Sequence, residues 1–256
     1  MASTAATTPR TLALREALAK RADLWRRTAP PDEKGPPAKL LLGELSTFGT
    51  PVRRMFRPAP ALPVAREPKV VMLLPGFGTH PMRMRYMARR LEQAGHKVKR
   101  WGLGFNLGPS EDNFVLLEKR VQQLHARYGE KVVLVGWSLG GIFAREIAKR
   151  HPQSISKVIS MGSPFSGSVY ANNAWRIYQL VTGHAVDQPL VKADLALKPP
   201  VDTVALWSPR DGVISPRSAC GRPGERDRAV ALRCTHLGFA ASDEAIEAVA
   251  RELEGS

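Results

Sequence analysis

Ser138 lies at the centre of Gly136-Trp137-Ser138-Leu139-Gly140, a spacing suited to a serine nucleophile. A β-branched apolar run, residues 131–135, precedes this stretch, and residues 141–150 follow it with apolar side chains on one helical face. This order predicts a strand buried on both faces, a tight turn and a helix. The glycines two positions from the serine are small enough for such a turn. The turn would lift the hydroxyl off the sheet edge and aim the first N–H groups of the helix at the attacked group, which predicts nucleophilic catalysis.

A serine nucleophile needs a base to take its proton and an acid to orient that base, and Asp211 is placed to be the acid. It follows the predicted strand 203–207 in a Pro-Arg-Asp-Gly turn, from which a carboxylate can reach a neighbouring loop. The rival Asp202 falls at the start of the same strand, on the wrong edge of the sheet. Two more candidates fall in the segment between this strand and the preceding one: Asp187 and Asp194.

His236 is the histidine best placed to be the base. It follows the predicted last strand, 229–233, comes after the acid in the sequence, and is followed by Gly238. His80 adjoins a Pro-Gly turn and is expected to contact substrate. Three other histidines are expected on helices or at helix ends, exposed to solvent: His96, His125 and His151. The last, His184, falls in the segment 166–200.

With these residues in view, the sequence from about 68 to 254 resembles the α/β-hydrolase superfamily, and more narrowly its small lipases and esterases. The resemblance rests on five motifs in the superfamily's order: Leu73-Leu74-Pro75-Gly76-Phe77-Gly78, the serine turn, Met161-Gly162-Ser163-Pro164, Ser208-Pro209-Arg210-Asp211-Gly212-Val213 and Thr235-His236-Leu237-Gly238. It implies an α/β fold with a mostly parallel central sheet, flanking helices and a small helical cap. Pro75 stands where many relatives carry histidine, which weakens assignment to any one lipase family.

The resemblance implies a serine hydrolase that cleaves small-molecule or lipid-like carboxylic esters through an acyl-enzyme intermediate. Ser138 would attack, His236 would transfer the proton, and Asp211 would orient the histidine. The N–H groups of Phe77 and Leu139 would hold the oxyanion. Neither cofactor nor metal is expected, because the sequence has no H-E-x-x-H, no cysteine ligand set and no dinucleotide fingerprint.

Several alternatives use the same scaffold. The triad also serves acyltransferases, thioesterases and amidases, and a fold of this kind can carry a binding protein without catalysis. The intact serine, acid and histidine argue against the binding protein, which has no physical need for all three.

Five residues are expected to line the substrate pocket: His80, Trp137, Phe105, Phe165 and Trp175. In the α/β-hydrolases that the sequence resembles, an insertion at the place of residues 166–200 commonly caps the pocket. A predicted helix at 172–182 supplies aromatic side chains there. Packing against the core would explain those aromatic residues equally well.

The chain divides into an N-terminal helical and Pro-rich extension, 1–66, and a hydrolase-like domain, 67–256. In the extension, residues 11–27 predict a basic helix with Leu14, Leu18, Ala22 and Trp25 on one face. This face is expected either to pack on the domain or to associate with an anionic membrane surface.

Composition limits the function classes. Lys and Arg exceed Asp and Glu by 15 charges among 256 residues, with a pI near 10.4. The basic residues are scattered and no nucleic-acid motif occurs, so we expect no nucleic-acid partner. Neither a run of about 18 apolar residues nor an apolar signal segment is present, which predicts a cytoplasmic or peripheral membrane protein.

Cys220 and Cys234 each lie close in sequence to a predicted catalytic residue. A disulfide between them would close a loop of about 15 residues and contribute about 3 kcal/mol. Because cytosolic thiols usually stay reduced, the alternative of two free thiols is equally favoured.

Overall fold

One parallel sheet forms the centre of the protein. The computed structural model describes residues 9–49, 60–188, 191 and 193–255. Within them the strands pair in the order β2-β1-β3-β4-β5-β6, all parallel. Their bounds are β1 Val70–Leu74, β2 Lys97–Arg100, β3 Val132–Trp137, β4 Ile155–Met161, β5 Asp202–Trp207 and β6 Arg228–Ala231. The predicted α/β fold with a parallel central sheet is confirmed.

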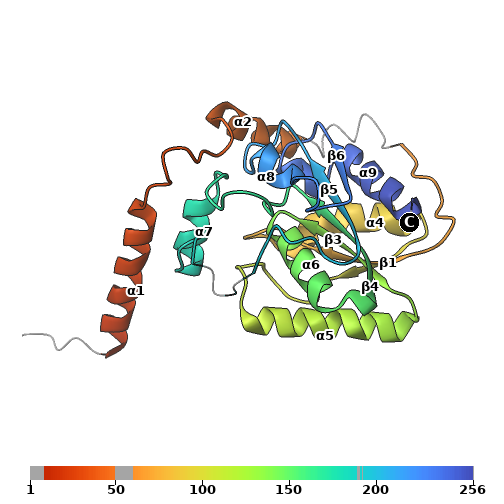
Figure 1. Ribbon diagram of the computed structural model, residues 1–256, viewed down its shortest axis with the longest axis horizontal. Helices are drawn as coiled ribbons and strands as arrows, with labels where there is room; N and C mark the ends of the chain where they lie inside the picture. Colours follow the sequence, from red (N-terminus) through yellow and green to blue (C-terminus); the bar gives the residue numbers. More distant parts are fainter. Residues whose placement is uncertain (1–8, 50–59, 189–190, 192, 256) are drawn as a thin grey trace, which may run out of the picture.

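Helices cover both faces of this sheet (Figure 1). The helices α4 (Arg85–Gln93) and α9 (Asp243–Glu254) pack on one face, and α5 (Glu111–Tyr128) and α6 (Leu139–Arg150) pack on the other. Successive residues of β1 contribute to opposite cores because strand side chains alternate between faces. Burial on both sides explains why β1 and β3 are continuous apolar runs.

Local signals decide where the helices begin and end. Ser110 caps α5 by accepting the N–H of Asn113 at 3.2 Å, and Gly129 ends it in a left-handed conformation. Before α4, residues Pro81–Met84 form the 3-10 turn η2. His80 caps that turn: its Nδ1 accepts the N–H of Met82 at 3.3 Å.

The N-terminal extension contains α1 (Pro9–Arg26), α2 (Ala38–Gly43) and the 3-10 helix η1 (Glu44–Gly49). Its residues 1–8 and 50–59 lie outside the described residues. Figure 1 shows α1 at the edge of the molecule, alongside α7 (Trp175–Thr182), while α2 lies over the domain near α8 (Pro216–Cys220). The remaining 3-10 turns are η3 (Pro152–Ser154) and η4 (Leu237–Ala240).

The face of α1 that packs is not the predicted one. Leu24 is 5% exposed, and its carbonyl accepts a hydrogen bond of 2.8 Å from Gln179 of α7. Leu14, Leu18 and Trp25 are 61%, 57% and 47% exposed. Of the two alternatives given for this apolar stripe, packing on the domain is therefore wrong, because the contact with α7 uses a different side of the helix.

The cysteines do not form a disulfide. Both are free thiols, Cys220 partly exposed and Cys234 buried. Cys220 ends α8, where Arg226 approaches its sulfur at 3.9 Å, whereas Cys234 packs in the core beside α9. Burial raises the pKa of the Cys234 thiol, which keeps it protonated. Of the two alternatives open from the sequence, the structure therefore has the two free thiols and not the disulfide.

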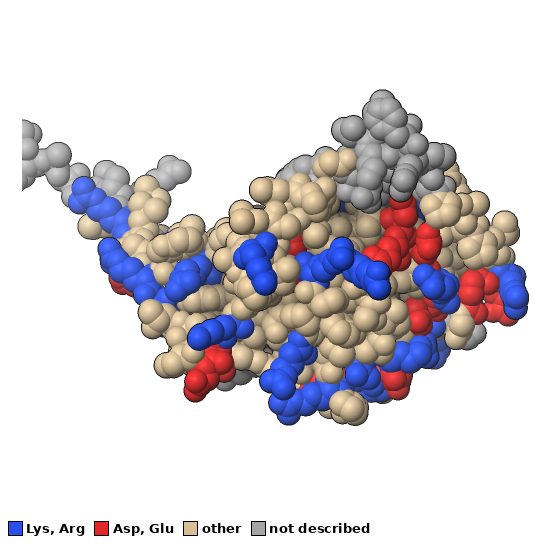
Figure 2. Space-filling model, turned by 90° about the horizontal axis from the view of Figure 1, so that it is seen from above, with Lys and Arg blue, Asp and Glu red and all other residues tan. Residues whose placement is uncertain are grey.

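Charge is spread over the surface. Figure 2 shows Lys and Arg side chains along the projecting end that contains α1 and across the face in view, with acidic side chains between them. In the described part of the chain, no helix is long and apolar enough to cross a membrane.

Candidate active site

Ser138 occupies the turn between β3 and α6 in a strained conformation. Its φ of 54° and ψ of −122° are unusual for a residue with a side chain, and no other described non-glycine residue has positive φ. A Cβ atom added at Gly136 would overlap the carbonyl of Gly140, and one added at Gly140 would overlap the carbonyl of Leu74. The predicted strand, turn and helix are confirmed, and the two glycines are required because backbone passes backbone there.

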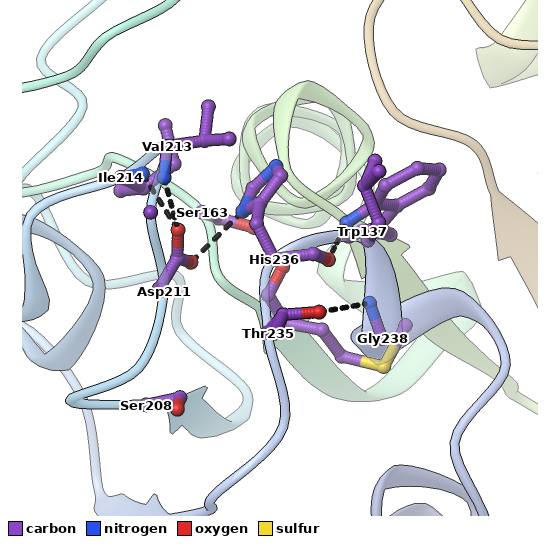
Figure 3. Close-up of polar contacts among 12 residues, drawn as sticks. Trp137, Ser163, Ser208, Asp211, Val213, Ile214, Thr235, His236 and Gly238 are labelled. Atoms are coloured by element: carbon purple, nitrogen blue, oxygen red, sulfur yellow. Dashed lines mark hydrogen bonds and ion pairs between the residues drawn. The ribbon is translucent and has the colours of Figure 1, made fainter. Parts of the chain in front are cut away.

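Asp211 and His236 meet as a buried pair from two separate loops (Figure 3). His236 Nδ1 lies 2.8 Å from Asp211 Oδ2. The other carboxylate oxygen of Asp211 accepts the N–H groups of Val213 and Ile214 at 2.8 and 2.7 Å. Because Nδ1 faces the carboxylate, Nε2 is the ring nitrogen left to exchange a proton with another group.

Trp137 ties the histidine loop to the serine strand. Its indole Nε1 donates a hydrogen bond of 3.0 Å to the carbonyl of His236, and the two rings lie 5.7 Å apart. Trp137 directly precedes Ser138, so the histidine is held beside the serine turn. No hydrogen bond joins the Ser138 hydroxyl to the imidazole in the described structure, and such bonds often tighten only when substrate is bound.

The predicted rival acids have other partners. Asp202, at the start of β5, pairs with Lys157 and Arg228 at 3.2 Å each. Asp187 faces Arg27 at 3.6 Å. Asp194 accepts the N–H groups of Ala196 and Leu197 at 3.1 and 3.2 Å. None of the three contacts His236, and Asp211 is the acid that the structure brings to the histidine.

The turn at residues 75–78 passes close to the serine. A Cβ atom added at Gly76 would lie 3.3 Å from Ser138 Cβ. Among the described residues, the backbone N–H of Phe77 and that of Leu139 donate to no acceptor. Two unpaired N–H groups near one serine are what an oxyanion requires.

Asn106 holds this turn and was not predicted from the sequence. Its side chain is fully buried, and Nδ2 donates to the carbonyl of Pro75 at 2.8 Å. Its backbone carbonyl accepts the N–H of Gly78 at 2.7 Å, and its own N–H donates to Thr79 at 3.0 Å. The only sequence signal was a single amide side chain within a glycine-rich loop, which did not reveal its partners.

Helix α7 covers the turn. The rings of Tyr178 and Phe77 lie 5.2 Å apart, and burial raises the pKa of Tyr178 to about 12. A Cβ atom added at Gly108 would lie 2.9 Å from Thr182 of the same helix. The insertion therefore lies against two loops at the carboxyl edge of the sheet.

The other predicted pocket residues fall into two groups. The rings of His80 and Phe105 lie 5.3 Å apart beside the turn, tilted by 55° to each other, and Phe105 is 62% exposed. Phe165 is buried under the guanidinium of Arg145 at 4.0 Å, and Trp175 packs edge-on against Tyr170 at 5.2 Å. These contacts indicate packing roles for Phe165 and Trp175.

The remaining histidines lie away from this edge. His96 is buried, which contradicts the solvated role predicted for it, and its Nδ1 accepts the N–H of Lys69 at 3.3 Å. His125 contacts the carbonyl of Glu130 at 3.0 Å, and His151 faces Glu118 at 3.2 Å. Within the described ranges, no three His, Cys, Asp or Glu side chains are grouped as metal ligands.

Sequence comparison supports the fold assignment. A family model described as the alpha/beta hydrolase fold matches residues 69–182. A search of curated proteins found no match.

Many solved structures are similar to the chain. One, from work on the metagenome-derived lipolytic enzymes LipS and LipT, is 14% identical with a TM-score of 0.53, and the match covers 77% of this chain and 99% of that one. A lipase-esterase related protein from Clostridium acetobutylicum is 11% identical with a TM-score of 0.56, over 76% and 96% of the two chains. Bacillus licheniformis lipase BlEst2 is 16% identical with a TM-score of 0.55, over 75% and 96%. The chain therefore has the α/β-hydrolase fold, which it shares with these solved structures.

Proposed function

We propose that the protein is a serine hydrolase that cleaves carboxylic esters. The observation that carries the proposal is the buried Asp211–His236 pair, 2.8 Å between Oδ2 and Nδ1, beside a serine held at positive φ. The named activities of the similar lipases and esterases agree with it.

The reaction runs in two halves. Ser138 Oγ attacks the ester carbonyl while His236 Nε2 takes the hydroxyl proton, and Asp211 stabilises the resulting imidazolium. The N–H groups of Phe77 and Leu139 hold the oxyanion until the C–O bond breaks and the histidine protonates the leaving alcohol. Water, deprotonated by the same histidine, then attacks the acyl-enzyme and releases the acid and the free serine.

The decisive test is Ser138→Ala. Hydrolysis of short p-nitrophenyl esters should fall by a factor on the order of 10⁴ or more, because no nucleophile remains. Labelling by a fluorophosphonate probe should disappear, while the circular dichroism spectrum stays that of the wild type. Ser163→Ala is a matched control, since Ser163 is also buried and follows a neighbouring strand, β4.

Wild-type protein that neither hydrolyses esters nor reacts with the probe would favour a binding protein without catalysis. If the wild-type protein is active, a series of esters, thioesters and amides of increasing acyl length separates an esterase from a thioesterase or an amidase. The three substrate types differ in the leaving group, and the acyl length reports pocket depth.

We also propose that α1 associates with anionic lipid surfaces. The supporting observation is its exposed apolar stripe, Leu14, Leu18 and Trp25, on a helix that also carries Arg15, Lys20 and Arg26. Apolar side chains combined with basic ones are the pattern of helices that lie in a membrane interface.

A further inference from the structure

Glu44 is a buried carboxylate at the start of η1, in the N-terminal extension. Glu44 is only 4% exposed. It lies 25 residues before the region that the family model matches. A carboxylate is seldom buried unless its oxygens accept hydrogen bonds. Its partners therefore indicate what it does.

Both carboxylate oxygens bind the two loops that carry the proposed acid and base. Oε1 accepts the N–H of Gly212 at 2.9 Å and the N–H of His236 at 2.8 Å. Oε2 accepts the N–H of Leu237 at 2.8 Å. The Glu44 side chain thus joins Gly212, which follows Asp211, to His236 and Leu237.

Further contacts hold residues 36–47 of the extension against the acid and histidine loops. Gly212 packs so closely on α2 that an added Cβ atom would overlap the Leu40 carbonyl. Thr47 Oγ1 lies 2.7 Å from Thr235 Oγ1, directly before the histidine. Asn173 bridges the extension to the acid loop, since Nδ2 donates to Pro36 at 2.9 Å and to Gly212 at 2.8 Å.

These contacts have a consequence for the Asp211–His236 pair. The two residues come from loops that are separate in sequence, and their 2.8 Å contact requires both loops to keep one relative position. Hydrogen bonds to a charged acceptor are shorter and stronger than neutral ones, and Glu44 makes such bonds to both loops at once. Catalysis by the pair depends on that position, because a displacement of about 1 Å can cost about 100-fold in rate.

We propose that Glu44 is a positioning residue that locks the acid loop and the histidine loop together. The N-terminal extension is then part of the active-site structure, and the hydrolase domain is incomplete without it. This role rests on the proposed ester hydrolysis by Ser138, Asp211 and His236.

The test is Glu44→Gln in the full chain. The amide keeps the size of the side chain but replaces one accepting oxygen with an NH₂ group that cannot accept the loop N–H groups. We expect kcat for p-nitrophenyl acetate to fall about 10- to 100-fold with KM within about twofold, because orientation is lost and substrate binding is not. Hydrogen exchange in peptides covering residues 208–214 and 234–240 should become faster.

Asp32→Asn is the matched control. It removes an exposed carboxylate from the same extension and should leave kcat and the exchange of both loops as in wild type. Glu44→Asp, which keeps the charge but shortens the reach, should give an intermediate kcat and serves if Glu44→Gln is insoluble. A kcat within twofold of wild type, or unchanged exchange of both loops, would overturn the proposal.

Failure of the two proposals can be told apart. Inactive wild-type protein that does not react with a fluorophosphonate would reject the hydrolase assignment. The exchange measurement needs no substrate, so it still decides whether Glu44 joins the two loops.

Discussion

Ser138 illustrates how single residues are constrained at this site. Positive φ costs a residue with a side chain of order 1–3 kcal/mol, and the surrounding packing must compensate for it. The compensation comes from a hydrogen bond of 2.8 Å between the Ser138 N–H and the Met161 carbonyl, and from close backbone contacts at Gly136 and Gly140. Contacts from the ends of three neighbouring strands, β1, β3 and β4, thus stabilise the strained conformation of Ser138.

His96 gives a prediction at the same scale. Burial lowers its pKa below the ordinary value of 6.5, so the unfolded chain binds the proton more readily than the folded one. The free energy of unfolding should therefore fall as the pH drops below about 6.5, whereas the contribution of neutral His96 is fully present above that value. In His96→Gln this part of the pH dependence should vanish. Urea midpoints at pH 7.5 and 5.5 measure it, and an equal decrease in both proteins would contradict the prediction.

At the scale of elements, the loops at the carboxyl edge of the sheet support one another. The loop at 102–109 holds the turn at 75–79 through Asn106, and α7 packs on both. The acid and histidine loops are joined by Glu44 from the extension. Parallel strands bring these loops to the same edge, and only contacts between the loops set their mutual positions.

Asn106→Ala tests the support of the turn. Losing the hydrogen bond to the Pro75 carbonyl should let the Phe77 N–H move, and we expect kcat to fall about 10- to 100-fold, less than the loss of an oxyanion donor itself. Asn113→Ala is the control, since its Nδ2 binds Gly108 at 3.1 Å and not the turn. Equal kcat for Asn106→Ala and wild type would show that the turn needs no such support.

At the scale of the whole molecule, α1 projects from the body and attaches through α7 (Figure 1). Arg21 Nε donates to the Leu180 carbonyl at 3.0 Å, which reinforces the Gln179 contact. A lipid surface that binds α1 would therefore also lie next to α7, the helix that covers the candidate site.

Vesicle sedimentation tests this attachment. Wild-type protein should sediment with phosphatidylglycerol vesicles more than with phosphatidylcholine vesicles, because both charge and apolar area favour the former. The triple variant Leu14→Ser, Leu18→Ser, Trp25→Ser should lose this binding. Val115→Ser combined with Leu116→Ser removes exposed apolar side chains from α5 and should bind as wild type does. Equal sedimentation of the triple variant and wild type would discard the proposal.

The sequence by itself determined the parts of the protein that depend on local residue types. β-branched runs predict buried parallel strands, two glycines around a serine predict the tight turn before α6, and the resemblance indicated the order of serine, acid and histidine. These features hold because neighbours in the sequence create them.

Only the tertiary structure decided which distant groups meet. Glu44 binds N–H groups 168 and 192 residues away, and Asn106 binds Pro75 across 31 residues. The packed face of α1 and the burial of His96 likewise differ from expectation, and the structure decided between the disulfide and the free thiols, which the sequence had left open. Hydrophobic periodicity tells which side of an element is apolar, but a polar side chain finds its partner only after the chain has folded, so no local pattern records it.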